Sequence, residues 1–225
     1  MTPHLEILPP GQRLFWDEMA KCVPEPFVLY GGTAVALRHG HRSSVDFDYF
    51  SDQPLDHAAL HRALPVLDGG QTLQKGPDAM VALVPIGGDE VKLSFFGGIG
   101  FGRVGEPDRI AAHAVLASPL DLLATKLKAL HDRIEAKDYL DIEVLLRNGL
   151  TLTQGISASM ALFGRSLNPY DTAKAVAWFK DGGLEQSLPL ETRRYLGGVV
   201  ASFDPLVMPA RILSRRLATS IPGRD

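Results

Sequence analysis

Phe27-Val28-Leu29-Tyr30 runs directly into Gly31-Gly32-Thr33, and Asp46-Phe47-Asp48 follows a short distance downstream. The first four residues are apolar and favour strands, which predicts a short buried strand. Gly31 and Gly32 carry no Cβ atoms, so the backbone there can approach an anion closely. Thr33 is the expected N-cap of a helix over 34–38, and Gly40 is its expected end. The free N–H groups at such a helix start favour phosphate, although ordinary strand–turn–helix connections show the same pattern.

Asp46 and Asp48 are two residues apart, so on a strand both carboxylates point to one face. Val45, Phe47 and Tyr49 alternate with them, and we expect their face to be the buried one. Two carboxylates this close repel each other unless a cation or a proton lies between them. Mg²⁺ prefers oxygen ligands and commonly bridges one or two carboxylates to substrate phosphates. The pair therefore predicts a site for Mg²⁺ or Mn²⁺, with a solvated strand edge or turn as the alternative.

A second block of motifs lies further along the chain. It comprises Leu120-Asp121-Leu122-Leu123-Ala124-Thr125-Lys126-Leu127-Lys128-Ala129-Leu130, then Arg133, then Lys137-Asp138-Tyr139-Leu140-Asp141-Ile142. Together with Gly31-Gly32-Thr33, Arg38 and the run 44–51, this block resembles the AbiEii/AbiGii toxin group of nucleotidyltransferases. That group belongs to the DNA polymerase β-like superfamily, whose mark is a Gly-Gly/Ser loop followed by Asp-x-Asp. The resemblance covers roughly residues 27 to 148.

The resemblance implies nucleotidyl transfer, in which an acceptor hydroxyl attacks the α-phosphate of an NTP and pyrophosphate leaves. Such a reaction depends on positioning and charge neutralisation, and two carboxylate-bound metal ions can supply the latter. Asp46 and Asp48 would be the metal ligands, and Gly31, Gly32 and Thr33 would hold the triphosphate. Arg38 would pair with phosphate or with a carboxylate near the site. The resemblance further implies an acceptor such as tRNA or a protein side chain, and a toxin role beside an antitoxin partner.

Ser94 departs from the pattern of the superfamily, which normally supplies a third carboxylate from a later strand. The matching strand is 90–96, and Ser94 stands where that carboxylate is expected. A serine hydroxyl is neutral and a weaker ligand. Glu90 shares the face of Ser94 but lies roughly 13 Å away along the strand, too far to substitute for it. Catalysis with one metal, an acid recruited from elsewhere, and lost activity remain three open interpretations.

Lys126 and Arg133 are seven residues apart on a predicted helix and therefore lie near one face. The resemblance implies that Lys126 neutralises the β- and γ-phosphates and that Arg133 belongs to the same site, while a solvated lysine is the alternative. Asp138 and Asp141 are three apart and close on a helix. Asp138 could cap that helix, orient Lys126 or hold a water, whereas Asp141 could simply pair with Lys137. We predict Asp138 rather than Asp141 as the catalytic residue.

Composition narrows the class of protein. The 225 residues are 45% hydrophobic and 22% charged, which predicts a packed core rather than disorder. The net charge of −3 gives no general attraction to nucleic acid, and Cys22 is the only cysteine, so intrachain disulfides and multi-cysteine zinc sites are excluded. No apolar run approaches the roughly 20 residues of a membrane span, and the start of the sequence does not resemble a signal peptide. We therefore expect a cytoplasmic protein without a membrane segment.

The pattern of breaks predicts an α+β fold, with strands in the first half of the chain and helices after it. The resemblance implies that the fold is a nucleotidyltransferase-like mixed β-sheet flanked by helices, followed by a C-terminal helical bundle. The expected domains are 1–117, which holds the sheet, and 118–225, which is helical and contributes Lys126 and Asp138 to the cleft. Expected strands besides 27–30 and the Asp-x-Asp strand are 71–75, 80–85, 90–96 and 113–115, with a hairpin turn at 87–89. Expected helices besides 34–38 are 14–22, 56–64, 119–134, 137–148, 153–163, 170–180, 190–202 and 209–219.

The sequence also allows two other classes of function. A nucleotidyltransferase fold that binds a nucleotide or a partner protein without catalysis would account for Ser94. A metal-dependent phosphatase or nuclease built on Asp46 and Asp48 would lack the additional His or Asp ligands such sites usually gather. The end of the chain is basic and could contact RNA, although a solvated helix face explains it more simply. Its arginines are Arg193, Arg194, Arg211, Arg215, Arg216 and Arg224.

Overall fold

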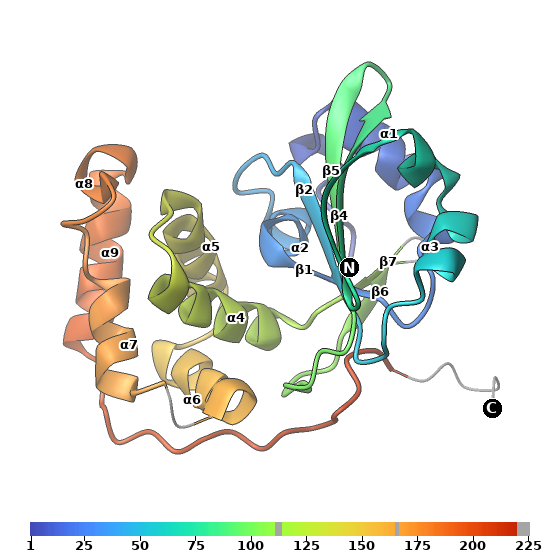
Figure 1. Ribbon diagram of the computed structural model, residues 1–225. Helices are drawn as coiled ribbons and strands as arrows, with labels where there is room; N and C mark the ends of the chain where they lie inside the picture. The colour runs from blue at the N-terminus through green and yellow to red at the C-terminus, as the bar shows by residue number, and fades with distance from the viewer. Residues whose placement is uncertain (111–113, 165–166, 220–225) are drawn as a thin grey trace. The chain divides into compact units, whose positions relative to one another are not determined.

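The structure is a computed structural model that describes residues 1–110, 114–164 and 167–219. The chain forms two compact units (Figure 1). The first contains residues 1–102 and 106–118 and the segment from 214 onward, and the second contains 103–105 and 119–213. The sequence predicts one division at 117/118, whereas the chain passes between the units at four places, 102/103, 105/106, 118/119 and 213/214.

A seven-stranded mixed sheet forms the centre of the first unit, with the order β3-β4-β5-β2-β1-β7-β6. In this sheet β2 runs parallel to β5 and antiparallel to β1, and β1 runs parallel to β7. Gly87 and Gly88 join β4 to β5 with positive φ at both residues, as a two-residue hairpin turn requires. The strands are β1 Val28–Tyr30, β2 Asp46–Phe50, β3 Gln71–Gly76, β4 Ala79–Ile86, β5 Asp89–Phe96, β6 Asp108–Ile110 and β7 Ala114–Leu116.

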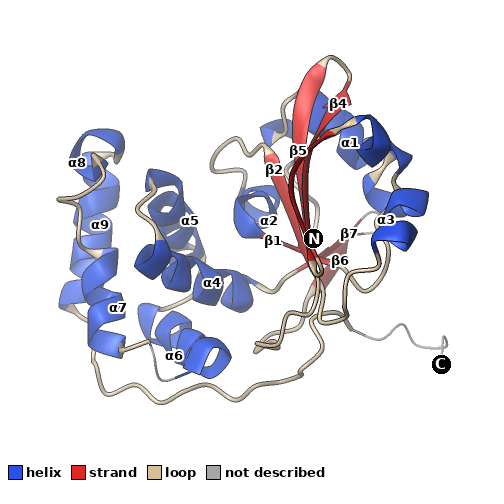
Figure 2. Ribbon diagram, viewed as in Figure 1, coloured by secondary structure: helices blue, strands red, loops and turns tan. Residues whose placement is uncertain are grey.

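Aromatic side chains fill the core between the sheet and α1. Burial alternates along β2, so Phe47 and Tyr49 are buried while Asp46 and Asp48 stay partly exposed. The ring of Phe15 on α1 lies 4.7 Å from that of Phe47. The helices of this unit are α1 Pro10–Glu18, α2 Gly31–His39 and α3 His57–Ala63, and Figure 2 shows α2 on one side of the sheet and α1 and α3 on the other. Short 3₁₀ turns cover Leu5–Ile7, Ala20–Cys22 and Pro65–Gly69.

The second unit consists of helices, and their starts follow from local capping. Thr151 and Gln154 form a capping box at the start of α6, and Asn168 accepts a hydrogen bond from the N–H of Tyr170 at the start of α7. Gly155 lets α6 approach α4 closely, because an added Cβ would lie 2.7 Å from the side chain of Leu123. The helices are α4 Pro119–Asp132, α5 Ala136–Arg147, α6 Leu152–Phe163, α7 Pro169–Val176, α8 Leu184–Ser187 and α9 Leu190–Ala201.

The predicted α+β class, with a mixed sheet and C-terminal helices, is confirmed, and several local predictions are wrong. Thr33 is not the N-cap of α2, which begins at Gly31 with Tyr30 as its cap. The expected helix 209–219 does not form, because its N–H groups bond to other segments: Ala210 to the carbonyl of Ser157 and Leu213 to that of Arg103. The short strand β6 escaped prediction. His113, at the start of a predicted strand, lies outside the described residues.

Two helices differ most from their predicted limits. The helix expected over 14–22 begins earlier, at Pro10, and gives way to a 3₁₀ turn. The helix expected over 170–180 ends at Val176. Across the three described ranges, no helix combines the length and the apolar character needed to cross a membrane.

Candidate active site

The two carboxylates of β2 occupy one face of the sheet, as their spacing predicts. Residues Asp46 and Asp48 alternate with the buried side chains of Phe47 and Tyr49. About 30% of the Asp46 side chain remains exposed, so its oxygens can be reached by a ligand. The local reason is the period of the strand, which sends every second side chain toward the core.

The neighbouring strand β5 places two polar residues beside this pair. In the parallel register, Lys92 is opposite Asp46 and Ser94 is opposite Asp48. The Nζ atom of Lys92 lies 3.7 Å from Oδ2 of Asp46, and the Lys92 side chain is 38% exposed. Ser94 is buried, with 2% exposure. The structure therefore brings Ser94 next to the Asp pair, as predicted, and adds Lys92.

Gly31 holds the start of α2 against Asp48. Its φ is +69°, and an added Cβ would lie 2.5 Å from Oδ2 of Asp48. Only a residue without a side chain fits there. The first residues of α2 carry N–H groups without partners inside the helix, so this end attracts negative charge. The predicted Gly31–Gly32 loop thus lies beside one of the two predicted metal ligands.

Thr33 connects α2 to β2 through its hydroxyl. It is 1% exposed, and its Oγ1 lies 2.8 Å from the hydroxyl of Ser44 and donates a hydrogen bond to the carbonyl of Asp46. These bonds position the first residue of the Asp pair. Because the hydroxyl is used in this way, a contact of Thr33 with the triphosphate would have to use its backbone N–H.

Arg38 lies at the other end of α2, and its side chain is 6% exposed. Its guanidinium donates to Oδ2 of Asp108 at 2.6 Å and to the carbonyl of Ala117 at 2.6 Å. The side chain therefore ties α2 to the β6–β7 edge of the sheet. The carboxylate that Arg38 contacts is thus that of Asp108 on β6, and phosphate binding by Arg38 stays a prediction.

In the second unit, Lys126 and Arg133 converge on Asp138. The Nζ atom of Lys126 lies 2.7 Å from Oδ1 of Asp138 and 2.7 Å from Oδ2 of Asp141, and Nε of Arg133 lies 2.9 Å from Oδ2 of Asp138. Both carboxylates are fully buried. Asp141 pairs with Lys126 and not with Lys137, which contacts Glu135 instead. The residue before α5 is Glu135, so Asp138 is not its cap.

The charges of this cluster balance. Two cations, Lys126 and Arg133, face two carboxylates, Asp138 and Asp141. Burial by itself raises the pKa of Asp138, but the hydrogen bonds from Arg133 and the charge of Lys126 outweigh it, so that pKa lies below its usual value. The carboxylate of Asp138 is therefore charged at neutral pH. Arg133 is the member of the cluster with a half-exposed side chain.

The donor set around β2 fits a hard divalent cation. Carboxylate oxygens are the ligands that Mg²⁺ and Mn²⁺ prefer, and Mg²⁺ needs only one or two of them beside water and phosphate. A larger protein cage is not present: in the ranges 1–110, 114–164 and 167–219, no three His, Cys, Asp or Glu side chains gather closely enough to hold a metal ion. Asp46 and Asp48 would thus hold the ion without a third acid.

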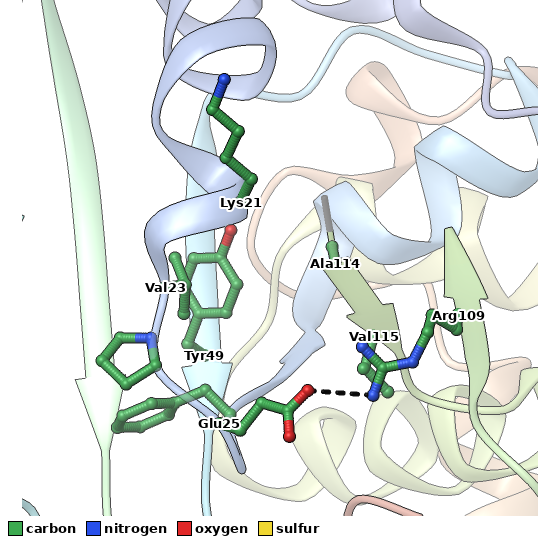
Figure 3. Close-up of a pocket in the computed structure, with 9 residues that line it drawn as sticks. Lys21, Val23, Glu25, Tyr49, Arg109, Ala114 and Val115 are labelled. Carbon is green, nitrogen blue, oxygen red and sulfur yellow. Dashed lines mark hydrogen bonds and ion pairs between the residues drawn. The ribbon is translucent and has the colours of Figure 1, made fainter. Parts of the chain in front are cut away.

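A small hollow lies on the opposite side of β2, against Tyr49 (Figure 3). Glu25 and Arg109 bridge its rim at 3.2 Å. Its volume is about 90 Å³, well below the roughly 300 Å³ at which pockets for drug-sized ligands begin. A nucleoside triphosphate does not fit there, and the hollow lies on the face of β2 away from Asp46 and Asp48.

Comparison with known proteins identifies the family and the fold of the chain. Residues 23–205 match the family model of the nucleotidyl transferase AbiEii toxin, Type IV toxin–antitoxin system. The chain belongs to this AbiEii family. An uncharacterized protein of Aquifex aeolicus (strain VF5) is 31% identical over 124 residues, which are 54% of this chain and 58% of that protein. The AbiEii chain thus spans less than two thirds of the length of this curated relative.

Two crystal structures share the fold of this AbiEii chain. One is a candidate nucleotidyltransferase from H. pylori, with a TM-score of 0.58 and 18% identity over 85% of this chain and 92% of that one. The other is JHP933 from Helicobacter pylori, with a TM-score of 0.58 and 21% identity over 85% and 89%. At these identities the likeness establishes the fold alone.

The residue that sequence reasoning missed in the site is Lys92. Its alternation with Glu90 and Ser94 is visible in the sequence, and it places Lys92 on the face of Ser94. What the spacing leaves open is the register between β2 and β5, and that register brings Lys92 to Asp46. Ser44, which supports Thr33, is the second missed contribution.

Proposed function

We propose that this AbiEii-family chain is a metal-dependent nucleotidyltransferase that transfers a nucleotide from an NTP to an acceptor hydroxyl. The observation that carries the proposal is the contact of Gly31 with Asp48, which joins the start of α2 to the Asp46–Asp48 face. The N–H groups at a helix start bind phosphate favourably. A cation held by carboxylates binds the phosphates of the same triphosphate. Both preferences are met within one small region of the first unit.

The chain's own residues have separate tasks in this proposal. Gly31 and Gly32 bring backbone N–H groups to the triphosphate, and Thr33 holds Asp46 in place. The acceptor hydroxyl oxygen attacks the α-phosphorus and its proton passes to solvent water. The bond from that phosphorus to the bridging oxygen of the β-phosphate breaks, and pyrophosphate leaves. Mg²⁺ or Mn²⁺, when bound to Asp46 and Asp48, would offset the charge that develops on the phosphate oxygens.

In the helical unit, the family resemblance implies a part in the reaction for Lys126 and Asp138 and phosphate binding for Arg133. The contacts within their cluster indicate different roles for Lys126 and Arg133. Because Lys126 is already paired with two buried carboxylates, its charge is compensated, whereas Arg133 is half-exposed. We therefore propose that Arg133 meets phosphate directly and that Lys126 keeps Asp138 and Asp141 in position.

We also propose an acceptor for the transferred nucleotide and a partner protein for the chain. Family membership supports an antitoxin protein as partner, and RNA such as tRNA, or a protein side chain, as acceptor. The arginines near the chain end support RNA only weakly, because those in the described residues, up to Arg216, are dispersed over α9 and the segment after it. Growth of cells that express the chain alone, or together with the neighbouring open reading frame, tests the toxin role. Growth inhibition that is relieved by Asp46→Asn and suppressed by co-expression of the neighbouring open reading frame would support the toxin role.

A transfer assay tests the enzymatic proposal. The protein is incubated with each α-labelled NTP, Mg²⁺, and total RNA or cell protein, and label in the acceptor is measured. We expect transfer by the wild type and a loss of at least about 100-fold in Asp46→Asn and Asp48→Asn, since each removes a charged metal ligand. The matched control is Asp17→Asn, an exposed carboxylate of α1 that pairs with Arg13.

The second candidate is a module that binds nucleotide without turnover, and Ser94 at the third-carboxylate position favours it. Calorimetry with NTP, paired with a pyrophosphate assay, separates the two. Binding without label transfer or pyrophosphate release in any acceptor mixture would reject the transferase and support the binding module. A phosphatase or nuclease has less support, because no third metal-ligand side chain joins Asp46 and Asp48 in the described part of the chain.

A further inference from the structure

Lys92 is a cation placed where a nucleotidyltransferase site needs positive charge. The β2–β5 register puts it directly opposite Asp46, and its Nζ atom lies 3.7 Å from the nearest carboxylate oxygen. That separation exceeds the 2.7–3.2 Å of an N–H···O hydrogen bond. The contact is therefore an ion pair without a formed hydrogen bond, and what Lys92 contributes to Asp46 is mainly its charge.

The surroundings of Lys92 limit how many metal ions the site can hold. Asp46 and Asp48 supply two negative charges, and the third-carboxylate position holds the neutral, buried Ser94. A second divalent ion would need ligands from the same two carboxylates, and one of these already faces an ammonium group. Like charges at such short range repel each other, so Lys92 opposes the second ion.

We propose that Lys92 supplies a fixed positive charge at Asp46 in place of a second divalent cation, so that the site takes one Mg²⁺ or Mn²⁺. The proposal rests on the proposed function, because it assigns the metal stoichiometry of that same site. Among the three interpretations of Ser94, it corresponds to catalysis with one metal. Lys92 acts by neutralising Asp46 and positioning its carboxylate.

Manganese binding to the nucleotide-free protein tests the proposal without any turnover. Free Mn²⁺ is read by its electron paramagnetic resonance signal during titration of the wild type, Lys92→Met and Lys92→Arg. We expect one Mn²⁺ per chain in the wild type. We expect about tenfold tighter binding in Lys92→Met, which keeps the length of the side chain but removes the charge. A unit charge and a divalent ion about 5 Å apart in water-like surroundings repel each other by roughly the energy of a tenfold change.

The controls separate charge from structure. Lys92→Arg keeps the charge and should keep the wild-type affinity. Lys75→Met removes an exposed lysine from β3, on the edge of the same sheet, and should leave Mn²⁺ binding unchanged. Melting temperatures of all variants, which should match the wild type because Lys92 is partly exposed, exclude a loss of folding as the cause.

Two Mn²⁺ ions bound per wild-type chain, no Mn²⁺ bound, or equal affinities of the wild type and Lys92→Met would each reject the role of Lys92. Failure here is distinguishable from failure of the transferase. Label transfer by a protein that binds two Mn²⁺ ions rejects the role of Lys92 alone. One Mn²⁺ site tightened by Lys92→Met, without label transfer to any acceptor, rejects the transferase alone.

Discussion

Two small residues decide where the carboxylates of the candidate active site lie. Gly31 adopts a positive φ and leaves no space for a Cβ beside Asp48, so the start of α2 can touch that carboxylate. Thr33 fixes the other carboxylate indirectly, by bonding to the main chain of Asp46. At this scale the site depends on the absence of one side chain and on a single hydroxyl.

Gly31→Ala should damage both stability and metal binding. The positive φ alone costs an L-residue about 1–2 kcal/mol, and the 2.5 Å approach to Oδ2 of Asp48 adds a clash. We expect a decrease of about 2–4 kcal/mol in the free energy of unfolding by urea, together with weaker Mn²⁺ binding. Gly183→Ala is the matched control, because Gly183 has the same φ of +69° and an added Cβ there would lie 3.8 Å from Oε1 of Gln186. Equal losses in the two variants would refute the role of the Asp48 contact.

At the scale of elements, a buried charge cluster joins α4 to α5. Asp138 and Asp141 are fully buried on α5, and Lys126 of α4 reaches both of them. Removing one partner of a buried pair leaves a charge uncompensated, which costs more than the pair contributes. The two helices are therefore held in register by electrostatics as well as by apolar packing.

Asp138→Asn should lower the free energy of unfolding by about 3–5 kcal/mol at neutral pH, because Lys126 and Arg133 lose a charged partner. Asp132→Asn is the control. Asp132 pairs with Lys128 on the exposed side of α4, and its loss should cost less than about 1 kcal/mol. Urea unfolding of the second unit, followed by helical circular dichroism, measures both. A loss no larger than that of the control would show that the buried cluster contributes nothing to stability.

The pH dependence of stability follows from the same carboxylate. The pKa of Asp138 is lower in the folded protein than in the unfolded chain. Its contribution is therefore complete above the unfolded value of about 4 and is lost as the pH falls through the folded value. Between about pH 5 and pH 2 the wild type should lose stability more steeply than Asp138→Asn does. Parallel stability curves for the two proteins would contradict the lowered pKa.

At the scale of the whole molecule, the chain returns to its first unit near its end. The side chain of Leu217 is 1% exposed, and its N–H donates to Oδ1 of Asp52 at 2.9 Å. Conversely, residues 103–105 lie between two segments of the first unit along the chain but belong to the second unit. There, the carboxylate of Asp121 accepts hydrogen bonds from the N–H groups of Val104 and Gly105. The first unit is thus completed by residues far from it in sequence.

Leu217→Ala should therefore destabilise the sheet unit. Truncating a buried leucine costs about 2–5 kcal/mol, and here the loss falls on the unit that carries Asp46 and Asp48. Amide hydrogen exchange in β2 should accelerate, while exchange in α5 stays unchanged. Leu213→Ala, at a half-exposed leucine of the second unit, is the control and should leave β2 protected. Unchanged exchange in β2 of Leu217→Ala would show that the returning segment does not support the sheet.

The sequence by itself determined the parts of this protein that depend on local pattern. Strand β2 and the shared face of Asp46 and Asp48 follow from a period of two, and the end of α2 at Gly40 follows from the preference of glycine for positive φ. The placement of Ser94 beside the Asp pair was also predicted correctly. The first two features depend only on residues that are neighbours along the chain. The placement of Ser94 follows from the order of motifs in the resembled family.

The tertiary structure alone decided the contacts between distant segments. Lys92 meets Asp46 because of the register of two parallel strands, and Asp141 meets Lys126 because α4 and α5 pack together. The extended end of the chain, predicted as a helix, bonds instead to Ser157, Arg103 and Asp52. Spacing along a sequence fixes which side chains share a face, but strand register and packing choose what that face meets, and those depend on the burial of the whole core.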